Sequence, residues 1–149
     1  METELSQQSD HSLAKFAGTS AFVAIAGIAD AVYLTVSHYT AAAVPCSITG
    51  GCETVLSSNY AELFGFPLAL YGALAYFAAF SLAVLTAFGR HQLWKLFGIL
   101  SFFMAAFSIW LIYVQAFILR AFCQFCLFSA ATSLLLFFIW AAYLFYRRK

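Results

Sequence analysis

Charged side chains are scarce in this chain of 149 residues: Asp, Glu, Lys and Arg make up 9% of it, whereas hydrophobic residues make up 64%. With a mean hydropathy of +0.91, the chain has too little polar surface to cover a water-soluble globule. The formal net charge of +1 gives no reason to expect a nucleic acid or a strongly charged partner. The composition therefore indicates an integral membrane protein, which by its length is a single domain.

Four long apolar stretches account for this composition. They cover residues 16–38, 67–88, 96–119 and 122–146. Each reaches the roughly 20 residues that a helix needs to cross the hydrocarbon of a bilayer. The alternation of apolar and polar residues over about ten positions, typical of membrane β-strands, is missing. We predict an all-α bundle of four transmembrane helices, with residues 1–15 as a polar cytoplasmic tail and residues 39–66 as the longest connection.

The basic residues predict the orientation of this bundle. Six of the seven would lie at one end and one at the other. The six are Lys15, Arg90, Lys95, Arg147, Arg148 and Lys149, and the seventh is Arg120. Because Lys and Arg concentrate on the cytoplasmic side of membrane proteins, both termini are expected to be cytoplasmic. The first and third connections are then extracytoplasmic.

All four cysteines fall at that extracytoplasmic face. Cys123 and Cys126 open the last apolar stretch with C-x-x-C spacing, and Cys46 and Cys52 lie in the first connection. On a helix, positions i and i+3 share a face, so the first two thiols could cycle between dithiol and disulfide. A helix N-terminus would also favour the reactive thiolate. The loop pair flanks two glycines, which suit a small, mobile disulfide loop.

Two thiol pairs at one membrane face suggest an electron relay by thiol–disulfide exchange. The polar, exposed loop pair suits a partner outside the membrane. The pair at the helix mouth suits an acceptor that dissolves in the bilayer, most simply a quinone. A zinc site with four cysteine ligands is the metal alternative, but an oxidising compartment favours disulfides, and we expect no metal. A membrane transporter or scaffold with purely structural disulfides is the other alternative.

Polar residues near the cysteines are further candidates. Asp30 is an acid inside an apolar stretch, in the same half of the bilayer as the cysteines. It could relay protons, or it could be an interior carboxyl hydrogen-bonded to Tyr or Ser neighbours. Gln115 and Tyr71 could line a cavity, although such residues more often serve helix packing. The segment Asn59-Tyr60-Ala61-Glu62 fits a capping box and predicts a short interfacial lid helix; an ordinary loop is the alternative.

Together these features resemble the vitamin K epoxide reductase family, on its bacterial branch. The resemblance rests on four spans, a C-x5-C loop and a C-x-x-C opening the fourth span. It also includes Cys52-Glu53-Thr54-Val55-Leu56-Ser57-Ser58, which leads to a Phe-Gly-Phe-Pro turn. No single motif is specific, but the combination is, and it covers nearly the whole chain from the first span onward.

The resemblance implies an order of exchanges. A thioredoxin-like (DsbA-like) extracytoplasmic protein would be reoxidised through Cys46. Cys52 would pass the electrons to Cys123 through an interpair disulfide. Cys126, paired with Cys123, would lie nearest a quinone of the ubiquinone or menaquinone (vitamin K) type and deliver the electrons to it. The expected location is the bacterial inner membrane, in contact with its lipids.

The resemblance also implies a quinone contact. Ser58 aligns with the hydroxyl residue that hydrogen-bonds a quinone oxygen, and Ser57 is the alternative. Because the sequence stops at Lys149 without a thioredoxin-like domain, a separate partner protein is expected. Leu68 and Ala130 stand where animal members carry asparagine and tyrosine. Quinone reduction coupled to disulfide formation is therefore expected, rather than epoxide reduction.

Overall fold

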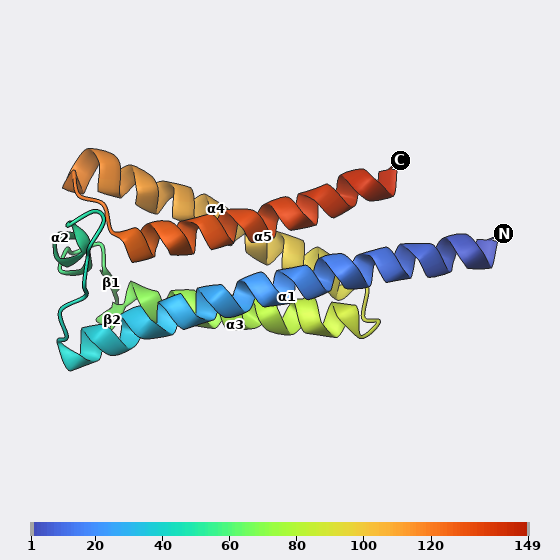
Figure 1. The fold of residues 1–149 in the computed structure, drawn as a ribbon, viewed down its shortest axis with the longest axis horizontal. Helices are drawn as coiled ribbons and strands as arrows, with labels where there is room; N and C mark the ends of the chain where they lie inside the picture. Colours follow the sequence, from blue (N-terminus) through green and yellow to red (C-terminus); the bar gives the residue numbers. More distant parts are fainter. Residues whose placement is uncertain (1, 149) are drawn as a thin grey trace.

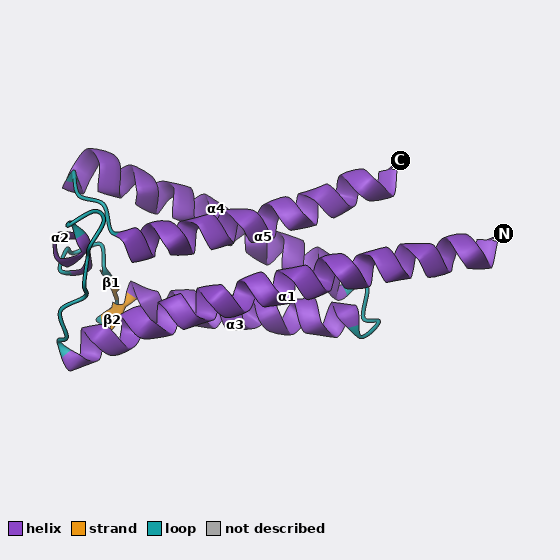
Figure 2. Ribbon diagram, in the orientation of Figure 1, coloured by secondary structure: helices purple, strands orange, loops and turns teal. Residues whose placement is uncertain are grey.

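The computed structural model describes residues 2–148 and places four long helices side by side, with short elements at one end (Figures 1 and 2). The long helices are α1 (Glu2–Thr40), α3 (Leu68–Ala87), α4 (Leu93–Tyr113) and α5 (Gln124–Arg148). Between α1 and α3 lie α2 (Cys52–Leu56), β1 (Glu62–Leu63) and β2 (Phe66–Pro67), and the π-helical segment η1 (Val114–Leu119) continues α4. Met1 and Lys149 lie outside the described residues.

Four helical segments are long and apolar enough to cross a membrane. They are Gln7–Thr40, Leu68–Ala87, Leu93–Leu119 and Gln124–Arg148. Large apolar side chains such as Phe22, Phe103 and Phe138 are exposed on these helices, as expected where lipid rather than water is the solvent. The predicted all-α, four-helix membrane bundle is confirmed.

Small residues allow α1 and α3 to pack closely. Ala17, Ala24 and Ala31, one every two turns of α1, are buried together with Ala79 and Ala83 of α3. Alanine side chains let two helix backbones approach each other, which is how helices associate where no hydrophobic effect drives them together. Of these alanines, Ala31 also lines the cavity that opens beside the cysteines.

Both described ends of the chain lie at one end of the bundle, together with the turn between α3 and α4 (Figure 1). The opposite end, which we call the cysteine end, holds residues 41–67 and 120–123. It therefore collects the loop with the first cysteine pair and the start of α5 with the second.

The N-terminal region is not a tail separate from the first span. α1 begins at Glu2 and runs without interruption to Thr40. Residues 2–15 contain no Gly or Pro, so nothing stops the helix. The carboxylate of Asp10 lies 3.3 Å from Nδ1 of His91 in the turn before α4, and Leu13 is buried in the bundle core.

The predicted lid helix at Asn59–Glu62 is wrong in position. The short helix of the cysteine end is α2, which begins at Cys52, and β1 and β2 pair antiparallel with Leu63 opposite Phe66. Phe64 and Gly65 at the hairpin turn have φ angles of 55° and 80°. A right-handed helix cannot contain such residues, and glycine adopts this conformation without strain.

Candidate active site at the cysteine end

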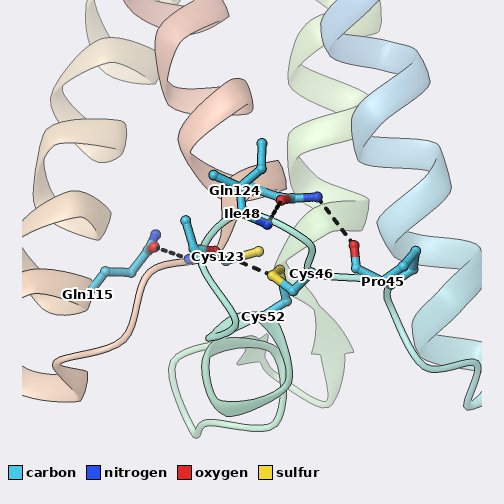
Figure 3. The surroundings of a disulfide bond; sticks show 8 residues. Pro45, Cys46, Ile48, Cys52, Gln115, Cys123 and Gln124 are labelled. Carbon is cyan, nitrogen blue, oxygen red and sulfur yellow. Dashed lines mark hydrogen bonds between the residues drawn. A yellow bond between two sulfur atoms is a disulfide. The ribbon is translucent and has the colours of Figure 1, made fainter.

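The four cysteines meet in one place. Cys46 and Cys52 form a disulfide with 5.8 Å between their Cα atoms, and Cys123 and Cys126 are free thiols. All four belong to a single apolar cluster, in which Cys52 and Cys123 have no exposed surface. Figure 3 shows the disulfide beside Cys123. The fold thus joins two cysteine pairs that are far apart in the sequence.

Cys123 lies just before α5 rather than inside it. Its carbonyl accepts the N–H of Leu127 at 2.9 Å, so it stands at the N-cap position, and Cys126 follows in the first turn. The hydrogen bond between the two thiols lowers the pKa of Cys123 from its ordinary 9.0 to about 7, against burial, which raises it. The cap position near the positive end of the helix dipole favours the thiolate in the same direction.

Gln115 positions the segment that carries Cys123. It lies in η1 and is 3% exposed. Its Oε1 accepts the N–H of Cys123 at 3.0 Å, and its carbonyl accepts the N–H of Ala121 at 3.1 Å. π-helical turns occur often at functional sites because they reorient single residues. Gln115 also lines the cavity, as predicted, but its oxygen is occupied by the backbone of Cys123.

A cavity of about 950 Å³ opens beside the second cysteine pair. This volume is within the range of pockets that hold small organic ligands. Every long helix and α2 contribute lining residues, mostly apolar. Among the described cysteines, Cys126 lines the cavity, whereas Cys46, Cys52 and Cys123 do not. Cys126 is therefore the thiol placed to react with a molecule bound there.

The two candidate serines and Tyr71 line this cavity, but each of their hydroxyls donates to a backbone carbonyl. Ser58 Oγ donates to Val55 at 2.7 Å, and Ser57 Oγ to Glu53 at 2.6 Å. The third is Tyr71, whose hydroxyl lies 3.2 Å from the Leu63 carbonyl in the hairpin. Either serine would have to rotate its hydroxyl to donate to a ligand. Ser58 is half-buried and Ser57 is exposed.

Asp30 lines the same cavity from α1. It is 8% exposed, and its Oδ2 has no hydrogen-bond partner among the described residues. Among the described residues, no Tyr or Ser neighbour therefore forms the hydrogen bond to Oδ2 that the alternative interpretation of Asp30 expects. An unpartnered carboxyl oxygen at this depth is costly.

Comparison with known proteins identifies the family. The sequence model of the vitamin K epoxide reductase family matches residues 19–141, which include α1 from Thr19 onward, the cysteine loop and most of α5. The chain belongs to this family. The chain is similar to the thiol-disulfide oxidoreductase LTO1 of Arabidopsis thaliana, a curated relative, with 32% identity over 119 residues. The aligned region is 74% of this chain but 32% of the relative, so the chain spans about a third of that protein's length.

Sequence reasoning missed a buried hydroxyl cluster in this family member. The hydroxyl of Tyr76, which is 1% exposed, lies 2.6 Å from Thr132 Oγ1 and 2.7 Å from Ser133 Oγ, and it donates to the Ser129 carbonyl. Tyr76, Ser129 and Ser133 line the cavity. The polar residues at 129, 132 and 133 follow helical spacing, which is the signal that could have predicted a polar stripe facing the interior.

Proposed function

We propose that this protein is a membrane thiol-disulfide oxidoreductase that oxidises a dithiol partner protein and reduces a membrane quinone. The observation that carries the proposal is the common cluster of both cysteine pairs, of which Cys126 alone lines the large cavity. Family membership and the similarity to a thiol-disulfide oxidoreductase support it. The disulfide between Cys46 and Cys52 leaves two free thiols, which is too few for a four-cysteine zinc site.

The exposure of the first pair favours Cys46 as the contact with the partner. Cys46 is half-buried, whereas Cys52 is fully buried. A thiolate of the partner attacks Cys46 Sγ, the Cys46–Cys52 bond breaks, and Cys52 leaves as a thiolate. The second thiol of the partner then releases Cys46 and closes a disulfide in the partner. The loop pair has gained two electrons.

The second exchange moves these electrons inward. The Cys52 thiolate attacks Cys123 of an oxidised Cys123–Cys126 pair and releases Cys126. Cys46 then attacks Cys52, which restores the loop disulfide and releases Cys123 as a thiolate. The products are a bonded loop pair and a reduced second pair. The structure has the same pairing, with a disulfide between Cys46 and Cys52 and free thiols at Cys123 and Cys126.

Cys126 completes the cycle at the cavity. Cys123 and Cys126 close a disulfide and give two electrons to the acceptor, which also takes up two protons, as many as the two thiols of the partner released, and becomes a quinol. The apolar lining suits a quinone ring and tail, with Ser58 or Ser57 near its oxygens, and Asp30 as a proton relay. Ubiquinone and menaquinone both fit this chemistry. We place the cysteine end outside the cytoplasm, in a bacterial inner membrane, with a separate thioredoxin-like partner.

The direct test is quinone reduction by the purified protein, with a reduced thioredoxin-like protein as donor and ubiquinone or menaquinone as acceptor. Changing Cys46, Cys52, Cys123 or Cys126 singly to Ser should abolish turnover. A donor that lacks its second cysteine should be trapped as a mixed disulfide with Cys46. The Cys46→Ser variant should form no such mixed disulfide. Full activity of Cys126→Ser, or no turnover with either quinone, would instead favour a transporter or scaffold with structural disulfides.

A further inference from the structure

Gln124 lies between Cys123 and Cys126, yet its side chain contacts the loop of the first pair. Its Oε1 accepts the N–H of Ile48 at 3.1 Å, and its Nε2 donates to the carbonyl of Pro45 at 3.2 Å (Figure 3). These two backbone groups flank Cys46 on either side. A single side-chain amide of the second cysteine motif therefore holds the loop around the first cysteine.

The other end of the loop rests on the same segment. Gly51, which precedes Cys52, is buried, and a Cβ atom added to it would lie 2.7 Å from the carbonyl oxygen of Phe122 and 2.9 Å from its nitrogen. Real Cβ atoms do not approach backbone atoms this closely, so glycine is required for the contact. The loop is thus held at Cys46 by Gln124 and at Cys52 by the backbone just before Cys123.

We propose that Gln124 is a positioning residue that holds the first cysteine loop against the second pair, so that Cys52 meets Cys123 during electron transfer. This inference rests on the proposed function. The contact matters most after the partner has reduced the loop pair, because the covalent bond between Cys46 and Cys52 is then broken. The loop is kept in place only by noncovalent contacts while the Cys52 thiolate attacks Cys123 and Cys126 leaves.

A primary amide suits this task because it supplies one acceptor and one donor. Glutamate, which has the same shape, keeps an acceptor for Ile48 but loses the donor to Pro45 and sets a carboxylate against its carbonyl. Pro45 and Ile48 are exposed, so both hydrogen bonds lie near solvent and are individually weak. The loop can therefore release from Gln124 and let a partner approach Cys46.

The first measurement isolates the interpair step without any quinone. In a Cys46→Ser/Cys126→Ser background, Cys52 and Cys123 are the remaining thiols, and a mild oxidant joins them. The rate of this disulfide formation is followed by mass spectrometry of the digested protein. Adding Gln124→Glu or Gln124→Leu should slow it by about five- to tenfold, as expected for the loss of one or two modest hydrogen bonds. Gln92→Glu is the matched control, because Gln92 lies before α4 and its side chain caps nothing.

The second measurement keeps this inference distinct from the proposed function. In a Cys46→Ser/Cys52→Ser background, dithiothreitol reduces the second pair directly, and quinone reduction no longer needs the loop. Gln124→Glu should leave this rate unchanged. If Gln124→Glu slows this quinone reduction as much as it slows interpair disulfide formation, Gln124 supports the fold or the cavity. If Gln124→Glu leaves the rate of interpair disulfide formation unaltered, Gln124 does not position the loop. Either result overturns the inference. Absence of quinone reduction with intact Gln124 would overturn the proposed function alone.

Discussion

Cys123 combines complete burial with a lowered pKa of about 7, which results from its hydrogen bond with Cys126. Thiols of low pKa are good leaving groups in disulfide exchange, and near neutral pH a substantial fraction is also available as the attacking thiolate. In the proposed relay, Cys123 must leave when Cys46 restores the loop disulfide. Its chemistry therefore depends on a neighbour three residues further along the chain.

Replacing Cys126 by Ala should raise the pKa of Cys123 from about 7 toward its ordinary value of 9.0. The variant lacks the hydrogen bond that stabilises the thiolate, whereas burial, which opposes ionisation, remains. In the unaltered protein the thiolate is present above about pH 7 and is lost below it; in the variant it should be lost already at a higher pH. Ultraviolet absorbance of the thiolate, titrated with Cys46 and Cys52 bonded, measures this. A variant midpoint that stays near 7 would refute the assigned cause.

Asp30→Leu should make the protein more stable and less active. Removing a buried, unpartnered carboxyl oxygen relieves a desolvation cost, for a gain in unfolding free energy of about 1 kcal/mol. Loss of a proton relay should lower quinone reduction by about a hundredfold. Thr19→Leu, at an exposed position of α1, is the control and should leave turnover unchanged. Thermal unfolding and quinone reduction are measured on both; undiminished turnover in Asp30→Leu would exclude the relay.

At the scale of elements, Tyr76 connects three helices. Its ring lies against Gly27 of α1, where an added Cβ would overlap ring carbons, and its hydroxyl reaches Thr132 and Ser133 of α5. A glycine in the middle of a helix normally weakens it. At position 27 the missing side chain is what allows the tyrosine of α3 to reach α5.

Two glycines of the same helix should therefore respond in opposite ways to alanine. Gly27→Ala should destabilise the bundle by about 1–3 kcal/mol, because Tyr76 must move and the hydroxyl cluster is disturbed. Gly18→Ala meets no atom within 4 Å, so it should stabilise α1 by up to about 1 kcal/mol. Thermal unfolding in detergent compares the two, and equal effects would mean that the ring of Tyr76 adjusts without cost.

Long and short elements differed in how far the sequence could predict them. The four long helices follow from sustained hydropathy, which many residues determine together. At the cysteine end, a single capping pattern, Asn59-Tyr60-Ala61-Glu62, competed with a hairpin turn at Phe64 and Gly65, and the turn prevailed. A segment of a few residues takes its structure from its surroundings, because an isolated turn of helix is unstable in itself.

At the scale of the whole molecule, the gathering of the cysteines was predictable and the contacts that align them were not. Charge distribution and cysteine spacing are enough to predict that both pairs lie at one face of the membrane. The hydrogen bond from Ile48 to Gln124 joins positions 76 residues apart, and the one between Tyr76 and Thr132 joins positions 56 apart. Such contacts depend on the relative rotation of helices, about which hydropathy carries no information.

The basic residues predict the orientation of the molecule in the membrane. Both described ends of the chain lie opposite the cysteine end (Figure 1). One charge asymmetry should therefore set the side of the membrane on which the chain ends lie and, with it, the opposite side for the cysteines. Lys15, Arg90, Lys95 and Arg147 belong to the terminal end of the helices, and Arg120 belongs to the cysteine end. This excess should retain the termini in the cytoplasm and expose the loop pair to an oxidising compartment.

Reporter fusions test this orientation. Alkaline phosphatase, which folds only when its disulfides form, should be active when joined after Asn59 and inactive when joined after Arg148. A fluorescent protein that matures only in the cytoplasm should behave in the opposite way. Activity of the phosphatase at both positions would mean that the helices do not all cross the membrane. The reverse pattern would place the cysteines in the reducing cytoplasm, where the loop disulfide would not persist and the proposed oxidation of a secreted partner could not occur.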